Sequence, residues 1–185
     1  MLIEPMTKRL QDQSHFDRAV RVVLHDAIAL HGAEFGNVQL KAGEDLVIVV
    51  QWGFRKPFLE FFRKITRDDG CSCGRALKSE HTVMVPDIET DEAFAPYRDA
   101  MRAAGVRGCM TTPLLTSRKF FLGNVSTHFA NVHRPTTIEV DTIKSYSVAA
   151  ANHLLNLLGK ESLKAKAISM SQRLYQEAGA AWITV

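Results

Sequence analysis

Three cysteines carry the most reactive side chains of this 185-residue chain. Cys71 and Cys73 form a C-x-C pair, His81 follows them, and Cys109 lies further along the chain. A zinc site needs a fourth ligand and a wider spacing of its cysteines, so we expect no metal here. A disulfide between Cys71 and Cys73 would join residues that lie too close together in the sequence. The simplest interpretation is that all three thiols are small packing groups in a reducing compartment.

A second set of chemically useful residues lies in the stretch Phe121–Phe129, where apolar and hydrogen-bonding side chains alternate. In an extended strand, one face would carry Leu122, Asn124, Ser126 and His128, and the other would carry Phe121, Gly123, Val125, Thr127 and Phe129. An unpaired buried amide or hydroxyl costs about 1–3 kcal/mol, so the polar face must meet solvent, buried partners or a ligand. A solvent-facing strand and a purely structural role for His128 are the competing interpretations.

Helices and strands must position these groups. Ser14 with Asp17 resembles a capping box, and apolar residues at helical spacing then continue to Gly32, which predicts a helix. Residues 34–41 and 45–53 read as a hairpin around 42–44, and the block at 46–50 is too β-branched and too short to favour a helix.

The second half of the chain alternates short elements with two long strands. We expect short helices at 58–65, 75–79 and 97–104 and strands at 82–86, 106–115 and 119–130. Thr136 with Glu139 forms a second capping box, which opens a helix that runs to about Leu158. Strands joined by hairpins and flanked by terminal helices predict an antiparallel α+β domain.

The tail after Gly159 has a heptad-like seam of apolar residues, formed by Leu163, Ala167, Met170, Leu174 and Ala178. This seam predicts a helix that contacts a partner or serves as a linker. We therefore divide the chain into an N-terminal arm (1–14), a domain (15–158) and a C-terminal helical extension (159–185).

Four motifs carry a resemblance to a known family. They are AEFGNVQL at 33–40, CGRAL at 73–77 ahead of VMVPDI at 83–88, GVR at 105–107 ahead of TPL at 112–114, and LGNVSTHF at 122–129. In this order and spacing the chain resembles the GAF domain family of small-molecule sensors. The resemblance implies a profilin-like antiparallel sheet of five or six strands, with terminal helices on one face and short helices and loops roofing a ligand pocket on the other. Members commonly dimerise through their terminal helices and signal along them.

This layout would turn Asn124, Ser126 and His128 toward a ligand. Thr112 on the neighbouring strand would add a wall, unless a shift of one residue replaces it by Thr111. The roof would come from Phe54, Phe58, Phe61, Phe62 and Phe94, with Cys73 beside the ligand. An apolar lining with a few convergent polar groups is typical of small-molecule sites, although the phenylalanines would also serve as ordinary core.

One branch of the family reduces free methionine sulfoxide with cysteines, and Cys73-Gly74 resembles its cysteine-glycine step. Arg63 stands where that branch has a further cysteine, and Cys109 lies too close to Pro113 to match the third. Only residues 91–94 resemble the cyclic-nucleotide pattern, and no cysteine precedes a histidine as bilin attachment would require. We therefore assign no catalytic residue and leave the cofactor unknown.

Composition narrows the class of protein. Hydrophobic residues make up 46% and charged residues 23% of the chain, which is typical of a folded globular domain. The net charge of +3 is scattered, which argues against nucleic acid as a partner. The longest apolar run, 46–50, is far shorter than the ~18 residues of a membrane span, and Glu4 and Pro5 interrupt any signal peptide.

Together these features predict a cytoplasmic sensory domain that binds a small molecule, forms a homodimer and acts on a separate signalling effector. The alternatives are an enzyme related to the sulfoxide reductases and a ligand-free dimerisation scaffold.

Overall fold

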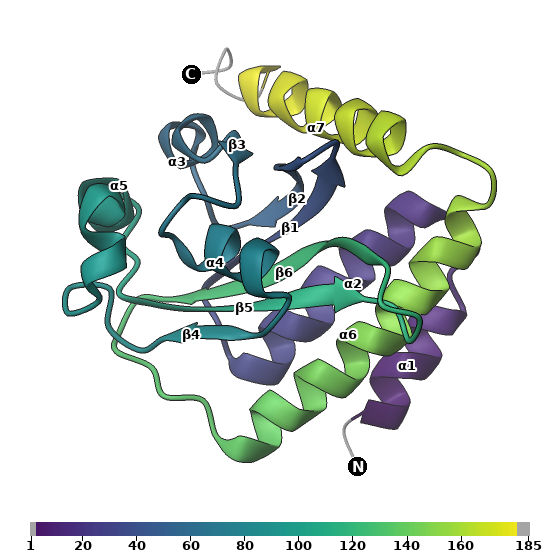
Figure 1. The fold of residues 1–185 in the computed structure, drawn as a ribbon, viewed down its shortest axis with the longest axis horizontal. Helices are drawn as coiled ribbons and strands as arrows, with labels where there is room; N and C mark the ends of the chain where they lie inside the picture. Colours follow the sequence, from purple (N-terminus) through teal and green to yellow (C-terminus); the bar gives the residue numbers. More distant parts are fainter. Residues whose placement is uncertain (1–2, 181–185) are drawn as a thin grey trace.

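The computed structural model describes residues 3–180 and contains one sheet of six antiparallel strands (Figure 1). The strands are β1 (Phe35–Ala42), β2 (Asp45–Trp52), β3 (Lys64–Ile65), β4 (Val83–Val85), β5 (Gly108–Leu115) and β6 (Phe121–Phe129). Their order across the sheet is β3-β2-β1-β6-β5-β4, so the two long hairpins meet where β1 pairs with β6. The predicted antiparallel α+β fold is confirmed.

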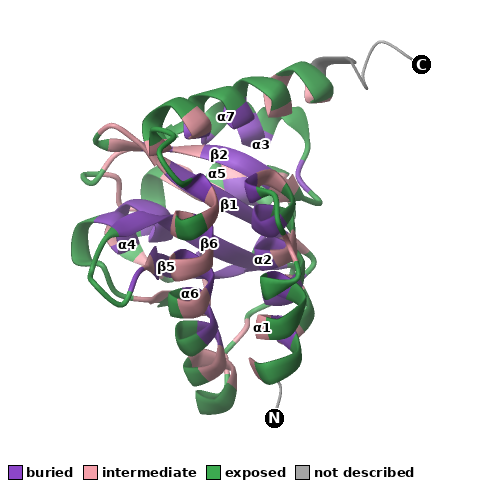
Figure 2. Ribbon diagram, turned by 90° about the vertical axis from the view of Figure 1, so that its right-hand side faces the viewer, coloured by how far each residue is buried: buried purple, intermediate pink, exposed green. Residues whose placement is uncertain are grey.

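Helices cover both faces of this sheet. One face carries α1 (Ile3–Gln11), α2 (Phe16–His31) and α6 (Thr137–Leu158). The other carries α3 (Lys56–Phe61), α4 (Ser72–Ser79), the 3-10 helix η1 (Glu92–Tyr97) and α5 (Arg98–Ala103), which we call the roof. Figure 2 shows the buried sheet between the two layers and the exposed outer surfaces of α1, α6 and α7.

Local sequence signals account for the ends of the long helices. Gly32 ends α2 with a φ of 58°, a left-handed conformation that glycine adopts without strain. Thr136 and Glu139 form the predicted capping box, in which the Glu139 carboxylate accepts from the Thr136 backbone N at 2.6 Å. The box predicted for Ser14 and Asp17 is wrong: His15 occupies the cap position of α2 and makes no side-chain capping bond.

Residues 3–11 of the predicted N-terminal arm form a helix that packs on the domain. Met6 and Leu10 of α1 are buried, and the Arg9 guanidinium donates to the buried Asp26 carboxylate of α2 at 2.6 Å. The Tyr146 hydroxyl of α6 donates to the other oxygen of Asp26 at 2.7 Å. This carboxylate therefore ties three helices together.

The helix of the C-terminal extension, α7 (Leu163–Ala180), turns back onto the domain after Gly159. Ala167 and Met170 are buried against the core of the α2–α6 face, while Leu174 packs against the roof cluster. The predicted seam therefore contacts this chain's own core. Figure 1 shows α7 lying across the β2 end of the sheet, next to α3.

Polar contacts fix α7 at both ends. Asp17 of α2 pairs with Lys166 at 2.9 Å and with Arg173 at 2.5 Å. These ion pairs use the carboxylate that was expected to take part in a capping box with Ser14. The Tyr175 hydroxyl donates to the Leu59 carbonyl of α3 at 2.7 Å. α7 thus joins the roof to the opposite face of the sheet.

The short elements of the roof differ from the prediction. The helix expected at 58–65 is α3 followed by a turn and β3, α4 begins three residues before the expected 75–79, and the helix expected at 97–104 is η1 followed by α5. Within residues 3–180, no helix combines the length and the apolar character needed to cross a membrane.

Candidate functional site

A layer of buried polar side chains lies between the sheet and the roof. β1 contributes Asn37 and Gln39, β6 contributes Asn124, Ser126 and His128, and β5 contributes Cys109 and Thr111. Strand register brings them together, because Asn37 lies opposite Ser126, Gln39 opposite Asn124, and Thr111 on the other side of Ser126. α4 packs on β5 and β6 and adds Ser72 and Cys73 from above.

The part of this layer under α4 is internally hydrogen-bonded. The Thr111 hydroxyl lies 2.9 Å from the Ser72 hydroxyl and 2.9 Å from the Ser126 hydroxyl. The Cys73 thiol lies 3.4 Å from the Ser126 hydroxyl, and the Cys109 thiol donates to Ser72 at 3.4 Å. The Asn124 amide nitrogen donates to the Cys73 carbonyl at 3.1 Å, which fixes the orientation of that amide.

The part of the layer nearer α3 is different. Four buried polar atoms find no hydrogen-bond partner within the described residues: Asn37 Oδ1, Gln39 Oε1, Asn124 Oδ1 and His128 Nδ1. We call these the unpaired group. Buried polar atoms in native proteins almost always have partners, so each exception calls for an explanation such as a bound water, ion or ligand.

A small space of about 10 Å³, which we call the closed space, lies beside three of the four residues of the unpaired group. Asn37, Gln39 and His128 line it from the sheet, and Phe58, Phe62 and Cys73 are among the residues that line it from the roof. This volume is about the minimum that holds a single water molecule. The roof therefore lies almost directly on the polar layer.

Aromatic rings separate this space from the outside. The rings of Phe54 and Phe58 stack with centroids 3.6 Å apart and an interplanar angle of 2°. Both rings meet His128 nearly at right angles, at centroid distances of 5.0 and 6.0 Å.

Outside this aromatic pair lies a groove of about 780 Å³ between α3 and α5. Phe54 and Phe58 form its inner wall, and Phe61, Ala100 and Ala104 contribute further apolar surface. Grooves of this volume and lining are typical of small-molecule sites. Phe58 lines both the groove and the closed space, so this one side chain separates them.

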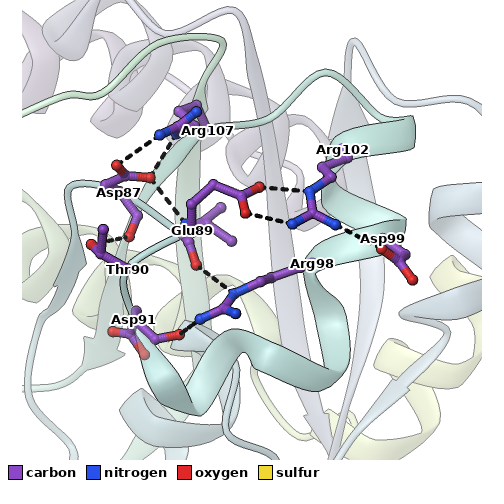
Figure 3. A network of polar contacts seen from close by, with 9 residues as sticks. Asp87, Glu89, Thr90, Asp91, Arg98, Asp99, Arg102 and Arg107 are labelled. Carbon is purple, nitrogen blue, oxygen red and sulfur yellow. Dashed lines mark hydrogen bonds and ion pairs between the residues drawn. The ribbon is translucent and has the colours of Figure 1, made fainter.

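Ion pairs hold the α5 wall of the groove (Figure 3). Arg102 of α5 pairs with Glu89 through two hydrogen bonds of 2.6 and 2.8 Å, and Arg98 donates to the carbonyls of Ile88 and Asp91. Arg107, just ahead of β5, forms a similar pair with Asp87. The loop before η1 therefore connects α5 to the sheet.

Burial keeps the titratable groups of the layer neutral. Desolvation lowers the pKa of His128 to about 3 and raises the pKa of Cys109 to about 12. Burial also raises the pKa of Cys73, although hydrogen bonds from Ser126 and Thr111 oppose this shift. At neutral pH the layer therefore holds a neutral imidazole and protonated thiols.

A family model for the GAF domain matches residues 2–154 of the chain. The chain belongs to the GAF domain family. Among proteins with curated descriptions, no sequence gives a significant match.

Solved structures share this GAF fold at low sequence identity. The GAF domain of a phosphoenolpyruvate-protein phosphotransferase from Coxiella burnetii superposes with a TM-score of 0.73 at 12% identity, over 86% of this chain and 94% of that one. A domain of a putative two-component sensor histidine kinase from Sinorhizobium meliloti gives 0.64 at 10% identity, over 76% and 92% of the two chains. The free methionine-R-sulfoxide reductase of Neisseria meningitidis, solved with its substrate, gives 0.68 at 12% identity, over 90% and 89%. These likenesses show a common fold.

The GAF fold brings most of the predicted site residues together. Asn124, Ser126 and His128 face the roof, and the predicted roof residues Phe54, Phe58, Phe62 and Phe94 are all buried there with Cys73. Phe94 packs on Tyr97 inside the roof and does not line the closed space, and Phe61 is 52% exposed.

Two predictions of side-chain direction are wrong. Thr112 lies opposite Val125 on the α2–α6 side of the sheet, and Thr111 occupies the position expected for it. The alternation predicted for Phe121–Phe129 fails at its start, where a bulge opposite Leu114 and Leu115 directs Leu122 to the α2–α6 core and Phe121 to the roof.

Asn37 and Gln39 were missed as members of this site. The alternation of Asn37, Gln39 and Lys41 with Val38 and Leu40 carried the signal, because it gives β1 a polar face. Gly123 explains how closely that face approaches β6: a Cβ there would collide with the Gln39 carbonyl.

Proposed function

We propose that this GAF domain is a cytoplasmic sensory domain of signal transduction that binds a small molecule between its sheet and its roof. The observation that carries the proposal is the unpaired group. Four polar atoms of buried side chains lack partners, three of their residues line one space under an aromatic roof, and a groove of ligand size lies directly outside. A ligand that supplies hydrogen-bond partners to these atoms would offset the desolvation penalty of the free protein.

The signal would pass through the helices. Ligand entry between sheet and roof displaces α3, and α3 is bonded to α7 through Tyr175. A ligand shifts such an equilibrium only by its different affinities for the two arrangements, so a change at α3 is the element to monitor. We include in the proposal a homodimer formed by the terminal helices, where Ile138 and Val148 of α6 are exposed, and a separate effector protein.

The enzyme alternative has less support. A nucleophilic cysteine must be accessible as a thiolate, whereas Cys71, Cys73 and Cys109 are all buried and burial raises the pKa of each thiol. A turnover assay on free methionine sulfoxide tests this alternative, and activity abolished by Cys73→Ser would favour it.

Native mass spectrometry of the freshly purified protein tests the proposal. We expect a non-covalent small-molecule mass on each chain, in a particle of two chains, and loss of that mass in His128→Leu. Bare chains, both as purified and after incubation with a metabolite extract, would favour the scaffold alternative and contradict a sensory role.

A further inference from the structure

The chemistry of the ligand can be narrowed from the lining of the closed space, given the proposed function. Asn37, Gln39 and His128 line it from the sheet, and thiols, a hydroxyl and apolar groups line it from the roof. Among the described residues, no Asp, Glu, Lys or Arg side chain lines this space. A charged group placed here would lose its hydration without gaining an opposite charge, which is strongly unfavourable.

The unpaired group also defines which hydrogen-bonding groups the ligand needs. Asn124 is oriented by its bond to Cys73, so its Oδ1 is an acceptor, and Asn37 Oδ1 and Gln39 Oε1 are acceptors too. A water molecule in the closed space has only two hydrogens to donate. Two hydrogens would satisfy Asn37 Oδ1 and Gln39 Oε1, which line the space, and would leave Asn124 Oδ1 without a donor.

The neighbouring rings restrict the shape. The Phe58 ring lies at the boundary between groove and closed space, with its plane at 84° to the His128 imidazole. A molecule that takes the place of the Phe58 ring next to His128 would lie against the ring of Phe54, which is parallel to that of Phe58, and this favours a flat group.

We infer that the site takes an uncharged, flat molecule with N–H or O–H donors along one edge, which enters from the groove between α3 and α5. The donors would meet Gln39 and Asn37, and the rest of the molecule would remain in the groove, which Arg55 and Arg102 line together with apolar side chains.

Three probes of the same shape test this class of ligand. Benzamide is neutral and carries N–H donors, benzoate is its anionic counterpart, and benzamidinium is its cationic counterpart. Titration of the isotope-labelled protein by NMR should give a Kd for benzamide that is at least about tenfold lower than for either charged probe, because the charged head of either probe would lose its hydration in the closed space without meeting a counter-charge there.

Two variants locate the binding. Gln39→Met keeps the side-chain length and Asn37→Leu the volume, and each removes one acceptor that makes no side-chain hydrogen bond within residues 3–180. We expect each to weaken benzamide binding about tenfold and to leave the melting temperature of the free protein unchanged or higher. Gln11→Met, at an exposed position on α1, is the matched control and should bind benzamide like the unaltered protein.

The outcomes separate this inference from the proposed function. Benzoate or benzamidinium binding as tightly as benzamide, and weakened by Gln39→Met, would overturn the ligand class and leave the site in place. No binding of any probe, or benzamide binding that neither variant weakens, would overturn both. A lower melting temperature in both ligand-free variants would mean that water already satisfies the acceptors, and would overturn the inference.

Discussion

The two halves of the roof are attached to the same sheet in different ways. Under α4, hydroxyls, thiols and the Asn124 amide bond to one another and to the Cys73 backbone. Under α3, the roof meets the sheet through the rings of Phe54 and Phe58, and three residues of the unpaired group, Asn37, Gln39 and His128, line the closed space there. One buried polar layer thus holds a helix in place at one end and leaves polar atoms without partners at the other.

The largest effect that we expect is the dependence of the protein's stability on pH. The pKa of His128 is lowered to about 3 and that of His31 to about 4, each mainly by burial, whereas both titrate near 6.5 when unfolded. Below pH 6.5 the unfolded state therefore binds more protons than the folded state, and stability falls with falling pH. Between pH 7 and pH 5 the free energy of unfolding should drop by about 4 kcal/mol, measured by denaturant titration.

His128→Phe removes one of these two titrations from the α3 half. We expect the pH dependence to fall by about half. An unchanged slope would show that His128 exchanges protons in the folded protein as freely as in the unfolded one.

The next effect belongs to the α4 half. Thr111→Val keeps the shape of the side chain but removes its bonds to Ser72 and Ser126, which leaves two buried hydroxyls with fewer partners. The free energy of unfolding should fall by about 1–3 kcal/mol in chemical denaturation. Thr112→Val is the matched control, because its hydroxyl makes one long contact of 3.5 Å with Thr82, and it should lose less.

Asn124→Leu connects the two halves. The substitution removes the donor to the Cys73 carbonyl under α4 together with one member of the unpaired group, so loss and gain oppose each other. We expect a net loss of about 1 kcal/mol, since the abandoned carbonyl stays buried. A variant as stable as Gln39→Met would show that the bond to α4 contributes nothing.

The smallest effect concerns the hydrogen bond from α7 to α3. Tyr175→Phe removes the hydroxyl that donates to Leu59, worth about 1 kcal/mol. Amide hydrogen exchange should become about fivefold faster in α3 and stay unchanged in α4. Equal acceleration in both helices would mean that the roof opens as one body.

Local signals predicted the fold because they act within a few residues. The capping box of Thr136 and Glu139 depends only on that segment, and Gly32 ends its helix for reasons of backbone geometry alone. Asp17 shows the limit of such signals. Its spacing from Ser14 suggested a cap, but Lys166 and Arg173, about 150 residues away in the sequence, compete for the same carboxylate.

The site was harder to predict because a single residue of register decides which face a side chain joins. A bulge between β5 and β6 moved Leu122 off the predicted face, and Thr111 replaced Thr112. The apolar seam of α7 was visible in the sequence, but the surface against which it packs depends on the turn at Gly159. With a φ of 59° at Gly159, the chain directs α7 back onto its own core, where Ala167 is buried.

Gly123 has a consequence for recognition. No side chain fits between the Gly123 Cα and the Gln39 carbonyl, so the main chains of β1 and β6 lie close together there. The spacing of these two strands sets how far apart the side-chain amides of Gln39 and Asn124 are held. A single added methyl at position 123 would push these strands apart. It would change which molecules fit the site while every group that contacts them kept its identity.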